Sequence, residues 1–299
     1  MKTALRWTAS LALLAAGLVL LDWTSLLVAA NRLTLWAFLC AVLLACAQFV
    51  PLLVRWYRLA GAGGTWRGCT ARYLYANLLN AISPGNLGGD VYRFFAFRGA
   101  QRSGATLVGI LLRERLLGLA SMLTGLLAGV IGMEWSGASQ GEAIWRLLGV
   151  AAAAGLAVLF CLPRLLTWWP VPQRWRGPLR DAIRSGSARG NASLVGWSLL
   201  ALGIWVATVQ FVAARLGVDV PWHVLVAIVT SAELIRIVPI TVQGLGLREG
   251  AYAALFGLAG YPAESGFVLG AIAYLAHGAA LVITGALGAA MLAREEARA

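Results

Sequence analysis

The sequence predicts an all-α polytopic membrane protein, with about six full transmembrane helices and two re-entrant broken-helix hairpins in an inverted repeat. Hydrophobic residues make up 60% of the 299 residues and charged residues only 12%, against about 25% charge in a soluble domain. Several uncharged runs exceed the ~18 residues that indicate a transmembrane helix. The apolar pattern is also broken twice in the same manner, by proline, then glycines, then an acid and an arginine. Such paired breaks are typical of transport sites.

The elements follow in order from the apolar runs. Full spans are expected at residues 8–29, 33–54, 104–133, 144–162, 194–214 and 265–292, and broken segments at 70–100 and 222–260. The first run resembles a signal peptide, but its apolar character continues past Asp22, which favours an uncleaved span. We expect a single domain over 1–299, with a first half (1–162), a cytoplasmic interfacial linker (163–190) and a second half (191–299). The four cysteines show no metal spacing, and no metal or cofactor is expected.

The basic residues predict the orientation. With a cytoplasmic N-terminus, sixteen of the 24 Lys and Arg lie inside, three lie outside, and five fall within apolar sequence. The sixteen include Arg55, placed just after the second span. This bias follows the positive-inside rule, which explains the net charge of +12 better than nucleic-acid binding does. Both termini of a multi-pass protein in the bacterial cytoplasmic (inner) membrane are therefore expected on the cytoplasmic side.

The charge distribution requires each broken segment to enter and leave the membrane on one side. In the first segment, residues 90–99 would form ten helical residues, about 15 Å of helix, or half of a ~30 Å hydrocarbon core. Pro84 and Pro239 stand 155 residues apart, about half the chain. This spacing favours an inverted repeat whose two breaks meet near the midplane. Two unrelated proline kinks in ordinary spans are the alternative.

Charges within the apolar sequence need partners, because each costs at least ~2.5 kcal/mol at the bilayer centre. Arg113, Glu114 and Arg115 are consecutive, so the two arginines cannot both face lipid while Glu114 faces the interior. At least one arginine must therefore find a carboxylate or a substrate anion. Internal partners would be Asp90, Glu233 or Glu249. Asp90 is expected to cap the helix that follows it and to pair with Arg93 at i+3.

Two half-helix N-termini, one after each break, would direct backbone N–H groups and positive dipole ends at an anion. Phosphate is the natural candidate, because guanidinium groups bind it bidentately. The amides of Asn80 and Gln243 are expected chiefly to satisfy freed backbone groups, with ligand contact as the second interpretation. No catalytic residue is expected. The candidate substrate-binding residues are Asn80, Pro84, Gly85, Gly88, Gly89, Asp90, Arg93, Arg113, Glu114, Arg115, Glu233, Arg236, Pro239, Gln243, Gly244, Gly246, Arg248 and Glu249.

Three motifs carry a family resemblance: Ser-Pro84-Gly85-x-x-Gly88-Gly89-Asp90-x-x-Arg93, Arg113-Glu114-Arg115-Leu-Leu-Gly118, and Pro239-x-x-x-x-Gly244-x-Gly246-x-Arg248-Glu249-Gly250. Over nearly the whole chain they resemble the transmembrane flippase region of lysylphosphatidylglycerol synthase/flippase proteins. The last motif is the most specific. The resemblance implies a stand-alone member without the synthase domain, and movement of a lipid across the bilayer.

The function predicted is therefore a non-enzymatic lipid flippase for an anionic or phosphate-containing amphiphile: a phospholipid, an aminoacyl-phospholipid, a polyprenyl-phosphate-linked sugar or another envelope lipid. A membrane-embedded phosphatase or glycosyltransferase is one alternative, although no nucleophile elbow or His-Glu-x-x-His motif supports it. A non-transporting partner of an envelope-lipid biosynthesis enzyme is the other. The expected partner is the lipid substrate, with no nucleic acid. A homo-oligomer and a complex with such an enzyme both stay open.

Overall fold

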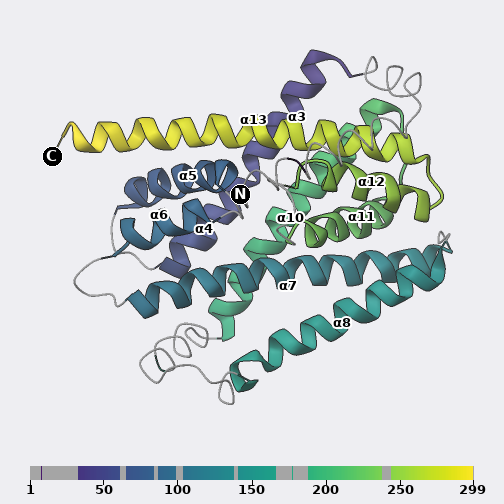
Figure 1. Ribbon diagram of the computed structural model, residues 1–299, viewed down its shortest axis with the longest axis horizontal. Helices are drawn as coiled ribbons and strands as arrows, with labels where there is room; N and C mark the ends of the chain where they lie inside the picture. Colours follow the sequence, from purple (N-terminus) through teal and green to yellow (C-terminus); the bar gives the residue numbers. More distant parts are fainter. Residues whose placement is uncertain are drawn as a thin grey trace. The chain divides into compact units, whose positions relative to one another are not determined.

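The computed structural model describes residues 33–60, 65–83, 87–98, 104–137, 141–165, 188–237 and 244–298, together with the isolated residues Thr8 and Gly177. Every element within these ranges is a helix, as the sequence predicts (Figure 1). The helices are α3 (Leu35–Ala47), α4 (Phe49–Ala60), α5 (Trp66–Ile82), α6 (Gly88–Ala96), α7 (Gly104–Ser136), α8 (Glu142–Leu165), α10 (Ala188–Leu216), α11 (Trp222–Ile235), α12 (Leu247–Leu258) and α13 (Ala263–Glu296).

Five stretches of helix are long and apolar enough to cross a membrane: Leu35–Ala60, Gly104–Ser136, Glu142–Cys161, Gly190–Leu216 and Ala263–Glu296. They correspond to five of the six predicted spans, and the remaining one, at 8–29, lies outside the described residues. The first stretch joins α3 and α4, which meet at Gln48. Pro51 explains this junction, because its ring nitrogen cannot donate the helical hydrogen bond to the carbonyl of Ala47.

The predicted broken segments form two pairs of short helices. In the first pair α5 has 17 residues and α6 has 9; in the second α11 has 14 and α12 has 12. At 1.5 Å per residue each is shorter than a ~30 Å hydrocarbon core. The partners within each pair lie side by side (Figure 1). Helix α6 begins at Gly88 and ends at Ala96, so the expected ten-residue helix over 90–99 is wrong in its boundaries. Re-entry from one side, and the inverted repeat, stay predictions.

The chain forms two compact units. We call them unit 1 (1–48, 122–153 and 202–280) and unit 2 (49–121, 154–201 and 281–299). Unit 1 contains α3, α11 and α12, and unit 2 contains α4, α5 and α6. Each unit draws residues from both predicted halves of the chain, so the units are a different division from the predicted repeat halves. The boundaries of those halves stay a prediction, and the interfacial part of the linker at 166–187, apart from Gly177, lies outside the described residues.

Close contact between helices depends on glycine in both units. In unit 2 a Cβ on Gly89 of α6 would lie 1.9 Å from the carbonyl oxygen of Ala76 on α5. In unit 1 a Cβ on Gly129 of α7 would lie 2.6 Å from the backbone nitrogen of Ala227 on α11. Small residues at such crossings let helix backbones approach closely, which is a typical means of association for membrane helices.

Candidate functional site

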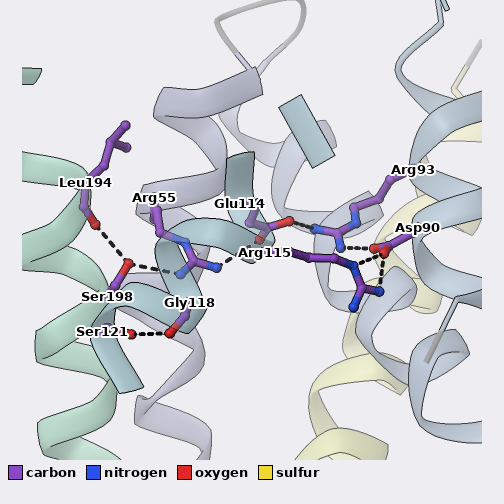
Figure 2. Close-up of polar contacts among 9 residues, drawn as sticks. All are labelled: Arg55, Asp90, Arg93, Glu114, Arg115, Gly118, Ser121, Leu194 and Ser198. Carbon is purple, nitrogen blue, oxygen red and sulfur yellow. Dashed lines mark hydrogen bonds and ion pairs between the residues drawn. The ribbon is translucent and has the colours of Figure 1, made fainter. Parts of the chain in front are cut away.

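A chain of ion pairs joins three helices of unit 2 (Figure 2). Glu114 on α7 accepts hydrogen bonds from Arg55 Nη2 on α4 at 3.1 Å and from Arg93 Nη1 on α6 at 2.6 Å. Arg93 also donates to Asp90 Oδ1. Asp90 Oδ2 in turn accepts from Arg115 of α7, whose Nε lies 2.8 Å away. We call these five residues the unit 2 network.

Arg55 differs from its predicted position just after the second span, which is expected to end at Val54. The helix instead continues to Ala60, and Arg55 is buried within it. Its Nη1 donates to Ser198 Oγ on α10 at 3.0 Å, and that hydroxyl donates to the carbonyl of Leu194 at 2.9 Å (Figure 2). Arg55 therefore connects Glu114 on α7 with Ser198 on α10.

Aromatic rings complete the surroundings of Arg93. Its guanidinium carbon lies 4.5 Å from the ring centroid of Trp56 on α4 and 5.6 Å from that of Tyr73 on α5. Cation–π attraction is strongest where the cation is desolvated, and the Arg93 side chain is only 6% exposed. These partners were not expected from the sequence, because aromatic residues are frequent throughout the chain.

The start of α6 corrects the expected role of Asp90. The helix begins after Leu87, so Asp90 occupies its third position and does not cap it. The capping acceptors come from the preceding segment: Gly88 N–H donates to Ser83 Oγ and Gly89 N–H donates to Asn80 Oδ1, both at 2.8 Å. The predicted backbone role of Asn80 is confirmed. Pro84 and Gly85 lie outside the described residues.

Exposure changes steeply along the unit 2 network. The side chains of Arg93 and Glu114 are 6% and 7% exposed, that of Asp90 is 12% exposed, and that of Arg115 is 50% exposed. The pairing of Asp90 with Arg93 and with Arg115 confirms that an arginine of the Arg113–Arg115 motif finds an internal carboxylate. Arg113 donates to Asn191 Oδ1 on α10. Arg115 is thus the member of the network that a ligand reaches most easily.

A second cluster lies in unit 1. Glu233 on α11 accepts from Arg236 Nε at 2.9 Å and from the hydroxyl of Tyr274 on α13 at 2.6 Å. The guanidinium carbon of Arg248 on α12 lies 4.1 Å from the centroid of the same tyrosine ring. Tyr274 therefore connects an acid and an arginine from two helices, and its part in the cluster was not expected from the sequence.

The geometry after the second break explains the spacing of its glycines. Gly244 and Gly246 have φ of +76° and +79°, values that disfavour residues with a Cβ. Glu249 Oε2 accepts a hydrogen bond from the N–H of Gly246 at 2.7 Å, so this carboxylate caps the start of α12. The neighbouring Arg248 contacts the ring of Tyr274. Pro239 and Gln243 lie outside the described residues.

The structure thus groups the described candidates by unit. Asn80, Gly88, Gly89, Asp90, Arg93, Arg113, Glu114 and Arg115 belong to unit 2, and Glu233, Arg236, Gly244, Gly246, Arg248 and Glu249 belong to unit 1. A single anion site formed by both groups stays a prediction. Within the described part of the chain, His, Cys, Asp and Glu side chains form no group suited to a metal ion.

Comparison with known protein families shows to which family the chain belongs. The model of the lysylphosphatidylglycerol synthase transmembrane region matches residues 7–288, which include both clusters. The chain belongs to this family. Members of the lysylphosphatidylglycerol synthase transmembrane-region family are multi-pass membrane proteins with a lipid-related role, and the region is not itself the catalytic part of the synthase. No curated protein and no solved structure matches the chain.

Proposed function

We propose that this protein moves an anionic, phosphate-containing lipid across the bacterial inner membrane. Family membership supports a lipid as the cargo. The charge of the unit 2 network supports an anion as its headgroup. The proposal includes the orientation predicted from the basic residues, with both termini in the cytoplasm.

The observation that carries the proposal is the excess of positive charge in the unit 2 network. Three guanidinium groups face two carboxylates within these five residues. Arg115 is the half-exposed member of the network, so its guanidinium is the positive group that a phosphate would contact. Guanidinium also matches phosphate geometry, since it can donate two parallel hydrogen bonds.

The proposed cycle places only the headgroup in protein. The phosphate binds at Arg115, while the acyl chains remain in the bilayer, so a lateral opening is needed. Transporters that work by alternating access commonly contain discontinuous helices. The short pairs α5 with α6 and α11 with α12 are the candidates for this role. The unit 1 cluster, with Arg248 and Arg236, is the candidate second position for the headgroup.

A reconstituted flipping assay tests this function. Purified protein in vesicles that contain fluorescent phosphatidylglycerol should accelerate the exchange of the label between leaflets, measured by dithionite quenching. Arg115→Ala should reduce this rate about tenfold, because a hydrogen bond to a charged group contributes about 1.5–3 kcal/mol and 1.4 kcal/mol corresponds to a factor of ten. Arg146→Ala, which removes an exposed ion pair with Glu134 on unit 1, serves as the matched control and should retain the rate.

Two outcomes would contradict the proposal. Equal flipping rates for Arg115→Ala and the wild type would remove the unit 2 network from the site. Chemical change of the lipid, detected by mass spectrometry of the same vesicles, would favour a membrane-embedded enzyme instead of a transporter.

A further inference from the structure

Helix α6 presents its polar residues to the protein and its apolar residues outward. Gly89, Asp90 and Arg93 are buried. Leu87, Val91 and Phe95, which recur every fourth position, are 54%, 54% and 63% exposed. Residues four apart lie on one face of a helix, so these three side chains form a continuous apolar stripe along the outside of unit 2. We call it the α6 stripe.

The α6 stripe borders the unit 2 network. At about 100° per residue, Asp90 lies about 60° around the helix from Leu87 and about 100° from Val91. On its other side lies Arg93, which is buried against Trp56 and Tyr73. Around α6 the order is therefore buried arginine, then Asp90, then the exposed stripe. Arg115 reaches Asp90 Oδ2 through Nε, so a half-exposed guanidinium lies next to an exposed apolar surface.

We infer that the α6 stripe binds an acyl chain of the lipid whose phosphate contacts Arg115. This inference rests on the proposed function and specifies its substrate site as bipartite. A phospholipid carries its phosphate and its acyl chains in one molecule. Because Arg115 and the α6 stripe lie next to each other in unit 2, one such lipid can contact both. The charge at Arg115 selects which lipid lies on the stripe, whereas an apolar face remote from such a charge takes any lipid. The cargo class is thereby a phosphate lipid that carries at least one acyl or prenyl chain.

A matched position elsewhere in the same unit provides the control. Val158 on α8 is also a valine and is 55% exposed, against 54% for Val91, and both belong to unit 2. A photo-crosslinking amino acid is placed at either position in the full chain. The protein is reconstituted in vesicles of an uncharged galactolipid with a minor fraction of phosphatidylglycerol, and the lipid adducts are identified by mass spectrometry after illumination.

The adduct at position 91 should be enriched several-fold in phosphatidylglycerol over its share of the vesicle, whereas the adduct at position 158 should match that share. Arg115→Gln should remove the enrichment at 91 and leave 158 unchanged. Excess soluble glycerol phosphate should reduce the enrichment in the protein with native Arg115, which gives the same test without dependence on how the variant folds. Equal composition at both positions, or enrichment at 91 that survives both treatments, overturns the inference.

The result also separates this inference from the proposed function. Crosslinking reports binding and not movement. Enrichment at 91 without any flipping would contradict transport alone. Flipping that depends on Arg115, with bulk composition at 91, would contradict the acyl-chain site alone.

Discussion

Arg93 Nη1 donates a hydrogen bond of 2.6 Å to Glu114 Oε2, across 21 positions of sequence and between α6 and α7. Glu114 uses its other oxygen for Arg55. One buried carboxylate thus pairs with two buried arginines, and it connects the short helix α6 to α7. Glu114 thus links two of the three arginines of the unit 2 network.

Glu114→Gln should destabilise the protein strongly. The amide keeps the size of the side chain but removes the charge, so Arg55 and Arg93 lose their shared partner in a buried site. Removal of one member of a buried ion pair costs about 3–5 kcal/mol. We expect a marked loss of thermal stability in detergent micelles, measured by the fraction that stays monodisperse after heating. Glu134→Gln, in an exposed pair with Arg146, is the control and should behave like the wild type. Equal stability of the two variants would mean that Arg55 and Arg93 do not need the carboxylate of Glu114, since Arg93 keeps its pair with Asp90.

Asp90→Asn should tighten binding of a phosphate lipid. Asp90 accepts from Arg115 and Arg93, so its carboxylate competes with an incoming phosphate for Arg115. Asparagine keeps an acceptor oxygen and removes the competing charge. We expect a several-fold lower KM for phosphatidylglycerol in the flipping assay. In a protein that already carries Arg115→Ala, the same substitution should change the KM less. A raised KM would show that Asp90 orients Arg115 for the substrate and does not compete with it.

Gly89→Ala should separate α5 from α6. The added Cβ would lie 1.9 Å from the carbonyl oxygen of Ala76, and that atom belongs to a helix backbone which cannot rotate away. Overpacking usually costs about 1–3 kcal/mol or more, and a backbone clash lies at the upper end. We expect little folded protein on size-exclusion chromatography. Gly118→Ala on α7 of the same unit is the control: a Cβ there meets nothing within 4 Å, and alanine favours a helix by about 1 kcal/mol over glycine.

Two substitutions at Tyr274 should separate its roles in unit 1. Tyr274→Phe removes the hydroxyl that donates to Glu233 at 2.6 Å and keeps the ring below Arg248. A hydrogen bond to a charged group contributes about 1.5–3 kcal/mol. Tyr274→Leu also removes the cation–π contact, and should lower the free energy of unfolding by a further ~0.5–2 kcal/mol. Unfolding in mixed micelles with increasing dodecyl sulfate provides the measurement. Equal effects of the two substitutions would assign no stability to the ring.

The sequence alone predicted the features that depend on composition and on the length of its apolar runs. Five of the predicted spans match helices, because a run of apolar residues with the length of the bilayer has few other uses. The angular spacing of Arg113, Glu114 and Arg115 correctly indicated that at least one of the arginines has an internal partner. The carboxylate partner of Arg115 also came from the expected set, since intramembrane charges require pairing.

Other features depend on contacts between distant segments, and local sequence carried no sign of them. Arg55 followed the end of an uncharged run and was therefore assigned to a loop, while its actual partners, Glu114 and Ser198, lie 59 and 143 positions away. Asp90 had the residue type of a cap, but Ser83 and Asn80 from the preceding segment already satisfy those N–H groups. Tyr274 was one aromatic residue among many until the fold placed it between Glu233 and Arg248.

The contact between Gly89 and Ala76 has a consequence for how unit 2 can move. The backbones of α5 and α6 are in direct contact at Gly89 and Ala76, which opposes sliding of one helix along the other. The hydrogen bonds of Gly88 and Gly89 with Ser83 and Asn80 also join the end of α5 to the start of α6. We therefore expect helices α5 and α6 to move together as one rigid body. If Arg115 binds the headgroup as proposed, its release is expected to involve motion between this pair of helices and α7, which the ion pairs of Arg93 with Glu114 and of Asp90 with Arg115 join.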